Sequence, residues 1–191
     1  MARSMLIGIT IGAFLTGLGV SYAIFNASSQ FTVTTTSANT DLEKYKIAER
    51  IASEHLKTFD DLDFDVFTNQ KWDRLKESHS QDITVYWPDG HKTQGLERHI
   101  EDLKAMFVYA PDTRIQEHPI KIASGEWTSV IGVMEGTFTE PMPLPDGSSI
   151  PPTGKSFKLT MCTVGHWKDG VMDEEYLFWD NQTFMKQIGL A

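Results

Sequence analysis

The chain has 191 residues, enough for one domain of ordinary size with its own hydrophobic core. Its composition, 40% hydrophobic and 23% charged residues, is typical of a globular protein and argues against extensive disorder or a membrane protein with several spans. The net charge of -9 repels phosphate backbones, so we expect no nucleic-acid partner.

The first 27 residues predict an export signal. An uncharged apolar run over 5–25 follows Arg3, and Ser21 and Ala23 are the small residues that a signal peptidase reads. The run is also long enough to span a bilayer. The alternative is therefore an uncleaved N-terminal anchor that tethers the protein to a membrane. In both cases we expect a periplasmic or extracellular domain at 41–191, after a Ser/Thr-rich linker at 28–40.

Two helical stretches are predicted at the start of the domain. Thr40 and Glu43 form a capping box, and apolar residues recur at helical spacing from there to Phe59. An acidic connection over 60–65 follows. A second helical stretch is predicted over 68–78.

Beyond this point the sequence pattern changes. Residues 82–87 alternate like a strand, and helical spacing returns over 95–109 until Pro111 stops it. Asp169-Gly170 is a hairpin signal between the last two strands. The predicted strands after the helix cover 113–122, 127–139, 156–167 and 171–179.

This order of elements predicts an α+β domain. We expect about three N-terminal helices to pack on a cone-shaped, curved antiparallel sheet, with a short C-terminal helix over 182–188. A Pro/Gly-rich loop over 140–155 is longer than a hairpin needs and is a candidate lid. The concave side of such a sheet suits an apolar pocket with a few convergent polar groups.

Three stretches carry a resemblance to a known family: DITVYWPDGHKTQG (82–95), PPTGKSFKLTM (151–161) and VGHWKDGVMDEEYLFWDNQTFMKQIGL (164–190). They resemble the SnoaL-like polyketide cyclase or ester cyclase family of the nuclear transport factor 2 superfamily, over 48–191. The resemblance implies acid–base chemistry without a cofactor, in which a carboxylate deep in the cone takes a proton next to a carbonyl. It also implies a homodimer formed by pairing of exposed sheets.

The last strand offers the candidate catalytic residues. Alternation with period two places Met172, Glu174, Tyr176, Phe178 and Asp180 on one face, which we expect to line the pocket. Asp180 matches the family's carboxylate at the strand end and is the first candidate base; the alternative is an N-cap for the closing helix. Glu174 is the second candidate base, or else half of an ion pair. Tyr176 is a candidate oxyanion donor, or else a core residue.

The histidines are scattered through the chain. His79 and His118 are candidate donors, although a lone histidine is more often structural. His91 and His99 are predicted to lie on solvated surfaces. The histidine spacing is unlike that of a metal site, and Cys162, the single cysteine, can form neither an intrachain disulfide nor a paired-cysteine zinc site. We therefore expect no metal.

Taken together, these features predict an exported enzyme of the cyclase or isomerase type. Its substrate would be a small apolar carbonyl or ester compound, and it would need no cofactor. The alternative is a noncatalytic module of the same fold that binds a small molecule or serves dimerisation, because this fold carries many unrelated functions.

Overall fold

The computed structural model describes residues 19–191, with side chains from residue 38 onward. The chain divides into two units, 1–45 and 46–191. Residues 1–18 of the expected signal peptide or anchor lie outside the described residues. Among the residues that are described, no helix combines the length and the apolar character needed to cross a membrane.

The described part of the first unit is helical. Helix α1 begins at Gly19 and ends at Asp61, in the second unit. The segment 28–40, predicted as a linker, therefore lies within a helix, and the helix starts well before the capping box at Thr40.

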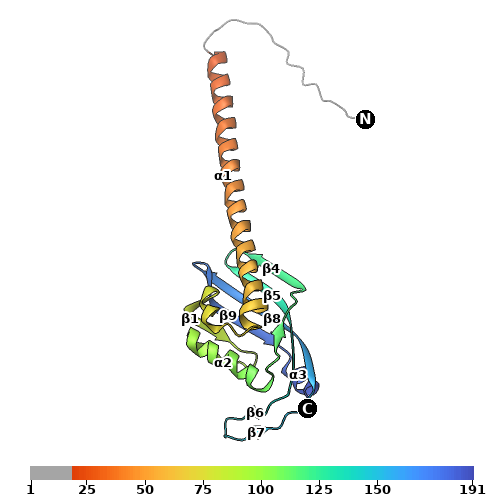
Figure 1. The fold of residues 1–191 in the computed structure, drawn as a ribbon. Helices are drawn as coiled ribbons and strands as arrows, with labels where there is room; N and C mark the ends of the chain where they lie inside the picture. Colours follow the sequence, from red (N-terminus) through yellow and green to blue (C-terminus); the bar gives the residue numbers. More distant parts are fainter. Residues whose placement is uncertain (1–18) are drawn as a thin grey trace, which may run out of the picture. The chain divides into compact units, whose positions relative to one another are not determined.

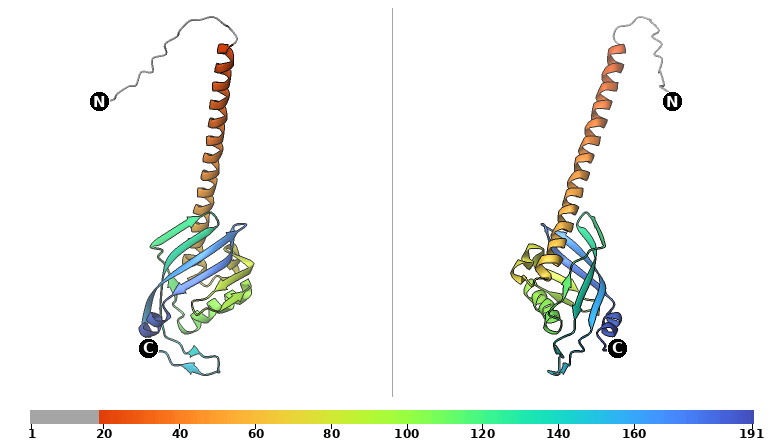
Figure 2. Two further views of the ribbon diagram at one scale, coloured as in Figure 1. Left: turned by 180° about the vertical axis from the view of Figure 1, so that it is seen from behind. Right: turned by 45° about the vertical axis from the view of Figure 1, so that its right-hand side comes forward.

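The second unit is a curved sheet with helices on one face (Figures 1 and 2). The strand order is β2-β1-β9-β8-β5-β3, and β4 also pairs with β5. These pairings are antiparallel except for β1 with β9, which is parallel. The α+β class and the curved sheet are confirmed. The strands are β1 (His79–Tyr86), β2 (Lys92–Gln94), β3 (Arg114–Ile115), β4 (Ile120–Ser124), β5 (Trp127–Thr137), β8 (Ser156–Lys168) and β9 (Val171–Trp179).

Helices lie on the inner face of this sheet and at one of its ends. The last turns of α1 and helix α2 (Leu96–Tyr109) cover the inner face, and helix α3 (Asn181–Gln187) packs against β8. The loop predicted as a lid carries a small hairpin formed by β6 (Met142–Pro143) and β7 (Ser149–Ile150).

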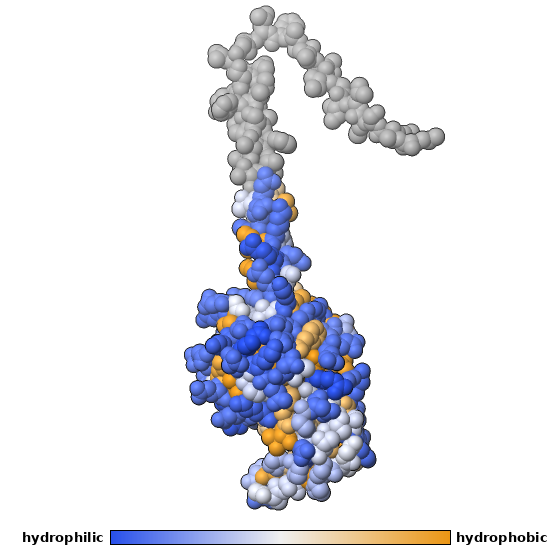
Figure 3. All heavy atoms as spheres, viewed as in Figure 1, coloured by the Kyte–Doolittle hydropathy of each residue, from blue (hydrophilic) through white to orange (hydrophobic). Residues whose placement is uncertain are grey.

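The core lies between the helices and the inner face of β5, β8 and β9. Residues on β5 and β8 alternate between buried and less buried, as expected for strands with one face on a core. Figure 3 shows the side of the domain that carries the helices, where hydrophilic residues predominate among scattered hydrophobic ones. The largest fully buried apolar side chains are Trp167, Phe59, Phe138, Leu75, Ile83, Ile115, Met172, Ile188, Val66 and Val85.

A bulge changes the alternation in β9. His166 pairs with Glu174, but the next residue of β8, Trp167, pairs with Met172, so Asp173 is an extra residue. Met172 and Glu175 are therefore both buried on the inner face. The predicted pocket-lining face was wrong from Glu174 onward, because strict alternation does not allow for the extra residue.

The structure of the acidic segment 60–65 also differs from the prediction. It is not a connection, because a π-helix over Leu62–Phe67 continues directly from α1. Phe59, Leu62 and Val66 are buried at helical spacing. Asp63 lies on the same helix and faces the inner side of the domain, because it is one residue after Leu62 and four after Phe59. π-Helical turns inside longer helices are frequent at functional sites.

Candidate functional site

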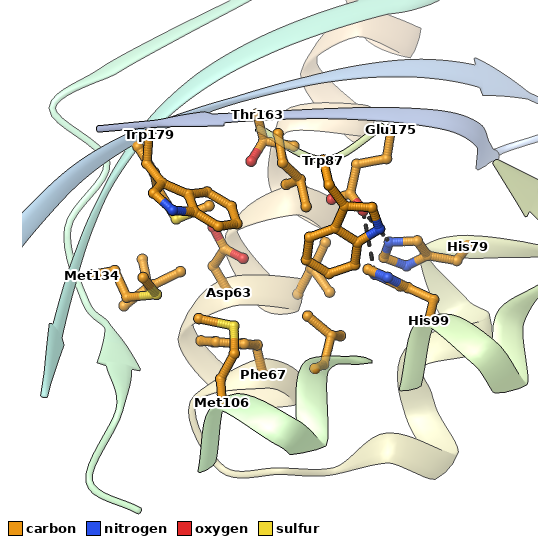
Figure 4. Close-up of a pocket in the computed structure, with 15 residues that line it drawn as sticks. Asp63, Phe67, His79, Trp87, His99, Met106, Met134, Thr163, Glu175 and Trp179 are labelled. Atoms are coloured by element: carbon orange, nitrogen blue, oxygen red, sulfur yellow. Dashed lines mark ion pairs between the residues drawn. The ribbon is translucent and has the colours of Figure 1, made fainter. Parts of the chain in front are cut away.

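A narrow apolar pocket lies between the inner face of the sheet, the π-helix and α2 (Figure 4). The space open to water-sized molecules is about 40 Å³, enough for a few waters. Its lining is mainly apolar, with two half-buried tryptophans whose ring centroids lie 6.3 Å apart. The apolar and aromatic lining residues are Leu62, Phe67, Trp87, Leu103, Met106, Ile115, Met134, Met161, Leu177 and Trp179. The polar lining residues are Asp63, His79, His99, Thr163 and Glu175.

Asp63 is held by a histidine from behind the pocket. His118 Nε2 lies 2.8 Å from Asp63 Oδ2, and His118 Nδ1 lies 2.8 Å from Asp60 Oδ1. Lys121 Nζ contacts the other oxygen of Asp60 at 2.5 Å. The His118 side chain is 1% exposed, so the two carboxylates fix its ring from both sides.

The electrostatics of this group follow from burial and pairing. Burial raises the pKa of Asp63 and outweighs the opposing effect of His118. Burial acts to lower the pKa of His118, but its bonds to Asp63 and Asp60 outweigh this, and the His118 pKa is raised. Asp63 is therefore a stronger base than an exposed aspartate. The neighbouring His118 holds its own proton more tightly than an exposed histidine does.

A second polar cluster joins β1, α2 and β9. Glu175 Oε2 lies 3.2 Å from His99 Nε2 and 3.7 Å from His79 Nε2, and dashed lines mark both pairs in Figure 4. The side chains of this cluster are almost fully buried: 1% of His79, 2% of His99 and 6% of Glu175 is exposed. This is a buried cluster of two imidazoles and one carboxylate.

The protonation states within this cluster differ. Burial lowers the pKa of His99 to about 4, so its ring is neutral at neutral pH. Burial acts to raise the pKa of Glu175, but the neighbouring His79 and His99 outweigh it and the Glu175 pKa is lowered. Glu175 is therefore an ionised carboxylate facing two imidazole rings.

The first predicted base lies outside the pocket. Asp180 is exposed and is the N-cap of α3, where it accepts hydrogen bonds from the backbone N–H groups of Gln182 (2.9 Å) and Thr183 (3.1 Å). The hydrogen bond from the Thr183 hydroxyl, together with these two backbone bonds, lowers the pKa of Asp180, so it is a weaker base than usual. The capping alternative describes its position.

Glu174 and Tyr176 lie on the outer face of the sheet because of the bulge in β9. The Tyr176 hydroxyl donates a 2.6 Å hydrogen bond to Glu174, and the Tyr176 ring stacks on Tyr86 with centroids 4.3 Å apart. Neither residue lines the pocket. The mixture of acids and aromatics that suggested an active-site wall is therefore a feature of the outer surface.

The two predicted histidines reach the site in different ways. His79 lines the pocket as a member of the buried cluster. His118 does not line it and contacts Asp63 from behind. The structure thus brings both near the site, with a carboxylate partner for each.

Sequence reasoning missed four of the five polar residues of the site: Asp63, His99, Thr163 and Glu175. Asp63 was assigned to a connection, although it shares the helical spacing of Phe59. His99 was assigned to a solvated surface, although it lies three residues after Leu96 and four before Leu103, both buried. That spacing is the signal that could have found it.

Comparisons with known proteins agree with this fold. The model of the SnoaL-like polyketide cyclase family matches residues 50–188. IdmH from Streptomyces antibioticus, a proposed polyketide cyclase, is similar with a TM-score of 0.60 and 21% identity, covering 71% of this chain and 98% of that one. A proposed SnoaL-like polyketide cyclase from Jannaschia sp. CCS1 has a TM-score of 0.64 and 19% identity, covering 74% and 95%. None of the curated proteins compared with the chain matches it.

The Asp180→Ala substitution tests the capping role. We expect it to lower the free energy of unfolding, because two backbone N–H groups of α3 lose their acceptor. Urea unfolding measures this change. The control is Asp82→Ala on β1, also exposed, with an expected change within about 0.5 kcal/mol. Equal stability of the two variants would show that the cap contributes nothing.

The raised pKa of His118 predicts a pH dependence of stability. A proton bound more tightly in the folded state stabilises it fully below the usual histidine pKa of 6.5, and this contribution is lost as the pH rises through the folded-state value. We expect unfolding free energies measured from about pH 6 to about pH 9 to fall more for the wild type than for His118→Gln. A constant difference between the two curves would contradict the raised pKa.

Proposed function

Because the chain belongs to the SnoaL-like polyketide cyclase family, we propose that it is an enzyme that abstracts a proton next to a carbonyl in a small, largely apolar substrate. One observation carries the proposal. Asp63, with 13% of its side chain exposed, lines an apolar pocket, and burial raises its pKa. A carboxylate in such surroundings is a stronger general base than one in water.

In the proposed reaction Asp63 accepts the proton. His118 binds Asp63 Oδ2, so Oδ1 is the oxygen that takes the proton from the substrate carbon. The electron pair of the broken C–H bond forms the enolate, and the negative charge moves to the carbonyl oxygen. His118 and Asp60 hold the carboxylate in place throughout, and Asp63 returns the proton to carbon in the closing step.

The enolate oxygen needs a positive or hydrogen-bonding group. Two candidates are already engaged: Trp87 Nε1 donates to Thr93 Oγ1 at 2.9 Å, and Trp179 Nε1 donates to Asn181 Oδ1 at 2.6 Å. The other polar groups of the pocket are Thr163 and the cluster of His79, His99 and Glu175. We assign the stabilisation of the enolate to the Thr163 hydroxyl and the imidazoles on this side of the pocket, and not to Glu175, whose ionised carboxylate would repel the negative charge.

The pocket also limits the substrate. Its lining favours an apolar molecule with one or two polar groups, in line with the cyclase names of the similar structures. A substrate of more than a few atoms requires the pocket to widen, since its water-accessible space is about 40 Å³. The lining residues Trp87, Met106 and Trp179 are only half-buried, and the unbranched side chain of a methionine adapts readily to a change in pocket shape.

We also propose that the protein is exported. The support is the apolar run over residues 5–25 behind Arg3, which suits either a cleaved signal peptide or a membrane anchor. A substrate that crosses or accumulates at a membrane would be compatible with the apolar pocket.

A homodimer is the last part of the proposal. Ile120, Ile122, Trp127 and Phe178 are 54%, 61%, 45% and 53% exposed. Strand register places them on one surface: Ile120 pairs with Ile131, which pairs with Cys162, which pairs with Phe178. A contiguous apolar face of this kind is typical of an interaction surface, and we assign a second copy of the chain to it.

Asp63→Asn tests the catalytic proposal. The assay is deuterium incorporation from heavy water next to the carbonyl of a panel of small ketones and thioesters, followed by NMR. We expect the rate to fall by about 10²–10⁴-fold, because the amide cannot accept the proton. The melting temperature should change by only a few degrees, since the side chains have the same shape.

Asp60→Asn is the matched control, because Asp60 contacts the same histidine from outside the pocket. We expect it to lose less than about 10-fold in rate. Ligands that change the fluorescence of the pocket tryptophans without any exchange in the wild type would overturn the enzyme proposal and favour the noncatalytic binding module.

Ile122→Glu and Phe178→Glu test the dimer. A charge on the apolar face disfavours its burial, so each variant should have the mass of a monomer by light scattering at a concentration where the wild type is a dimer. Val108→Glu on α2, where the valine is 49% exposed, is the control and should remain a dimer. A monomeric wild type, or dimeric face variants, would contradict the proposal.

A further inference from the structure

The cluster of His79, His99 and Glu175 has an arrangement that proton transfer by Asp63 does not require. One nitrogen from each ring and one carboxylate oxygen all lie within 4.8 Å of one another, and all three residues are buried. Within residues 38–191, His79 Nε2 and Glu175 Oε2 have no hydrogen-bonding partner although neither atom is accessible. Buried polar atoms without partners are costly, so their retention calls for an explanation.

We propose that His79, His99 and Glu175 bind one divalent transition-metal ion, of the Zn²⁺ or Fe²⁺ kind, in this pocket. Two imidazoles and one carboxylate form a ligand set that holds such ions in catalytic sites and leaves a position open. Imidazole nitrogens favour these ions over Mg²⁺ and Ca²⁺, which prefer oxygen ligands. The metal would supply the three polar atoms with a shared partner.

The surroundings of His79 support this assignment. His79 Nδ1 lies 2.8 Å from Ser78 Oγ, and Ser78 Oγ itself donates to the Leu75 carbonyl at 3.1 Å. The serine therefore accepts from His79 Nδ1–H, which leaves Nε2, on the side of Glu175, as the nitrogen that would bind an ion. Metal-ligating histidines are oriented in this way, by a hydrogen bond from the nitrogen that does not bind the metal.

Two of the three ligand distances are close to those of a metal site. Four ligands at about 2.0–2.1 Å around a tetrahedral ion lie about 3.3 Å apart. Glu175 Oε2 is 3.2 Å from His99 Nε2 and 3.7 Å from His79 Nε2. The two imidazole nitrogens lie within 4.8 Å of each other and would have to approach further for all three ligands to bind one ion.

The sequence could not reveal this set by local spacing. The ligands come from β1, α2 and β9, and the nearest two are 20 residues apart in sequence.

Metal binding does not depend on the proposed function, because it requires no turnover. If both hold, the open position faces the pocket that Asp63 lines, where the ion would polarise the substrate carbonyl.

The test is titration of the full, untagged chain, first stripped with a chelator, with Zn²⁺ in a calorimeter. We expect one ion per chain and no binding of Mg²⁺. Co²⁺ in the same site should give visible absorption bands of a four- or five-coordinate ion. Bound Zn²⁺ should raise the melting temperature, because it binds the folded state alone.

Glu175→Gln and His99→Ala are the informative variants. Each should weaken Zn²⁺ binding by at least about 100-fold, since even groups that only orient metal ligands contribute about 10–100-fold. His91→Ala, at an exposed histidine on the loop after β1, is the control and should bind within about 2-fold of the wild type. Circular dichroism checks folding; if one variant does not fold, the other variant and the wild-type Co²⁺ spectrum decide.

Zn²⁺ affinity equal in the wild type and Glu175→Gln, or no stoichiometric binding, would overturn the metal site. These outcomes are separable from failure of the proposed function. Asp63→Asn should keep the Zn²⁺ affinity within a few-fold, whereas it should lower the rate of deuterium exchange by about 10²–10⁴-fold. Metal binding without exchange would refute the enzyme proposal alone, and chelator-insensitive exchange without metal binding would refute the metal site alone.

Discussion

The site depends on the burial of two carboxylates in an apolar pocket. Removing a carboxylate from water is costly, so each one needs compensation from a nearby group. Asp63 obtains it from His118, which Asp60 and Lys121 in turn support toward the surface. Glu175 obtains it from His79 and His99. The two carboxylates consequently differ in basicity: burial raises the pKa of Asp63, whereas the imidazoles lower that of Glu175.

Two irregularities of the backbone place these groups. The π-helix over Leu62–Phe67 extends α1 and brings Asp63 into the pocket lining. The bulge at Asp173 reverses the alternation of β9, which directs Glu175 inward and Glu174 outward. Both are departures from regular geometry next to the polar part of the pocket, and such departures are frequent at functional sites. They separate the two faces of the sheet into different roles. The inner face carries the polar cluster, and the outer face carries an apolar surface with Trp127, Tyr176 and Phe178.

Much of the fold could be predicted from the sequence. The helical spacing of α2, the alternation in β5 and β8 and the Asp169-Gly170 turn are local signals, and each element formed close to its expected bounds. The predicted resemblance to the SnoaL-like family is confirmed by the family match over 50–188. Much of the site could not be predicted. Asp63 lies on a π-helical turn within a segment that was predicted as a connection. The bulge at Asp173 turns Glu175 inward, whereas strict alternation assigns Glu174 to that face.

The sequence by itself determined the class of fold, since hydrophobic periodicity and turn residues act over a few neighbouring positions. It also determined that Asp180 could cap α3, because an N-cap bonds to residues two and three positions later. Only the tertiary structure decided which carboxylates are buried and which histidines face them. His79, His99 and Glu175 come from three separate elements, and their meeting depends on strand register and helix packing, which are set by contacts between residues distant in the chain.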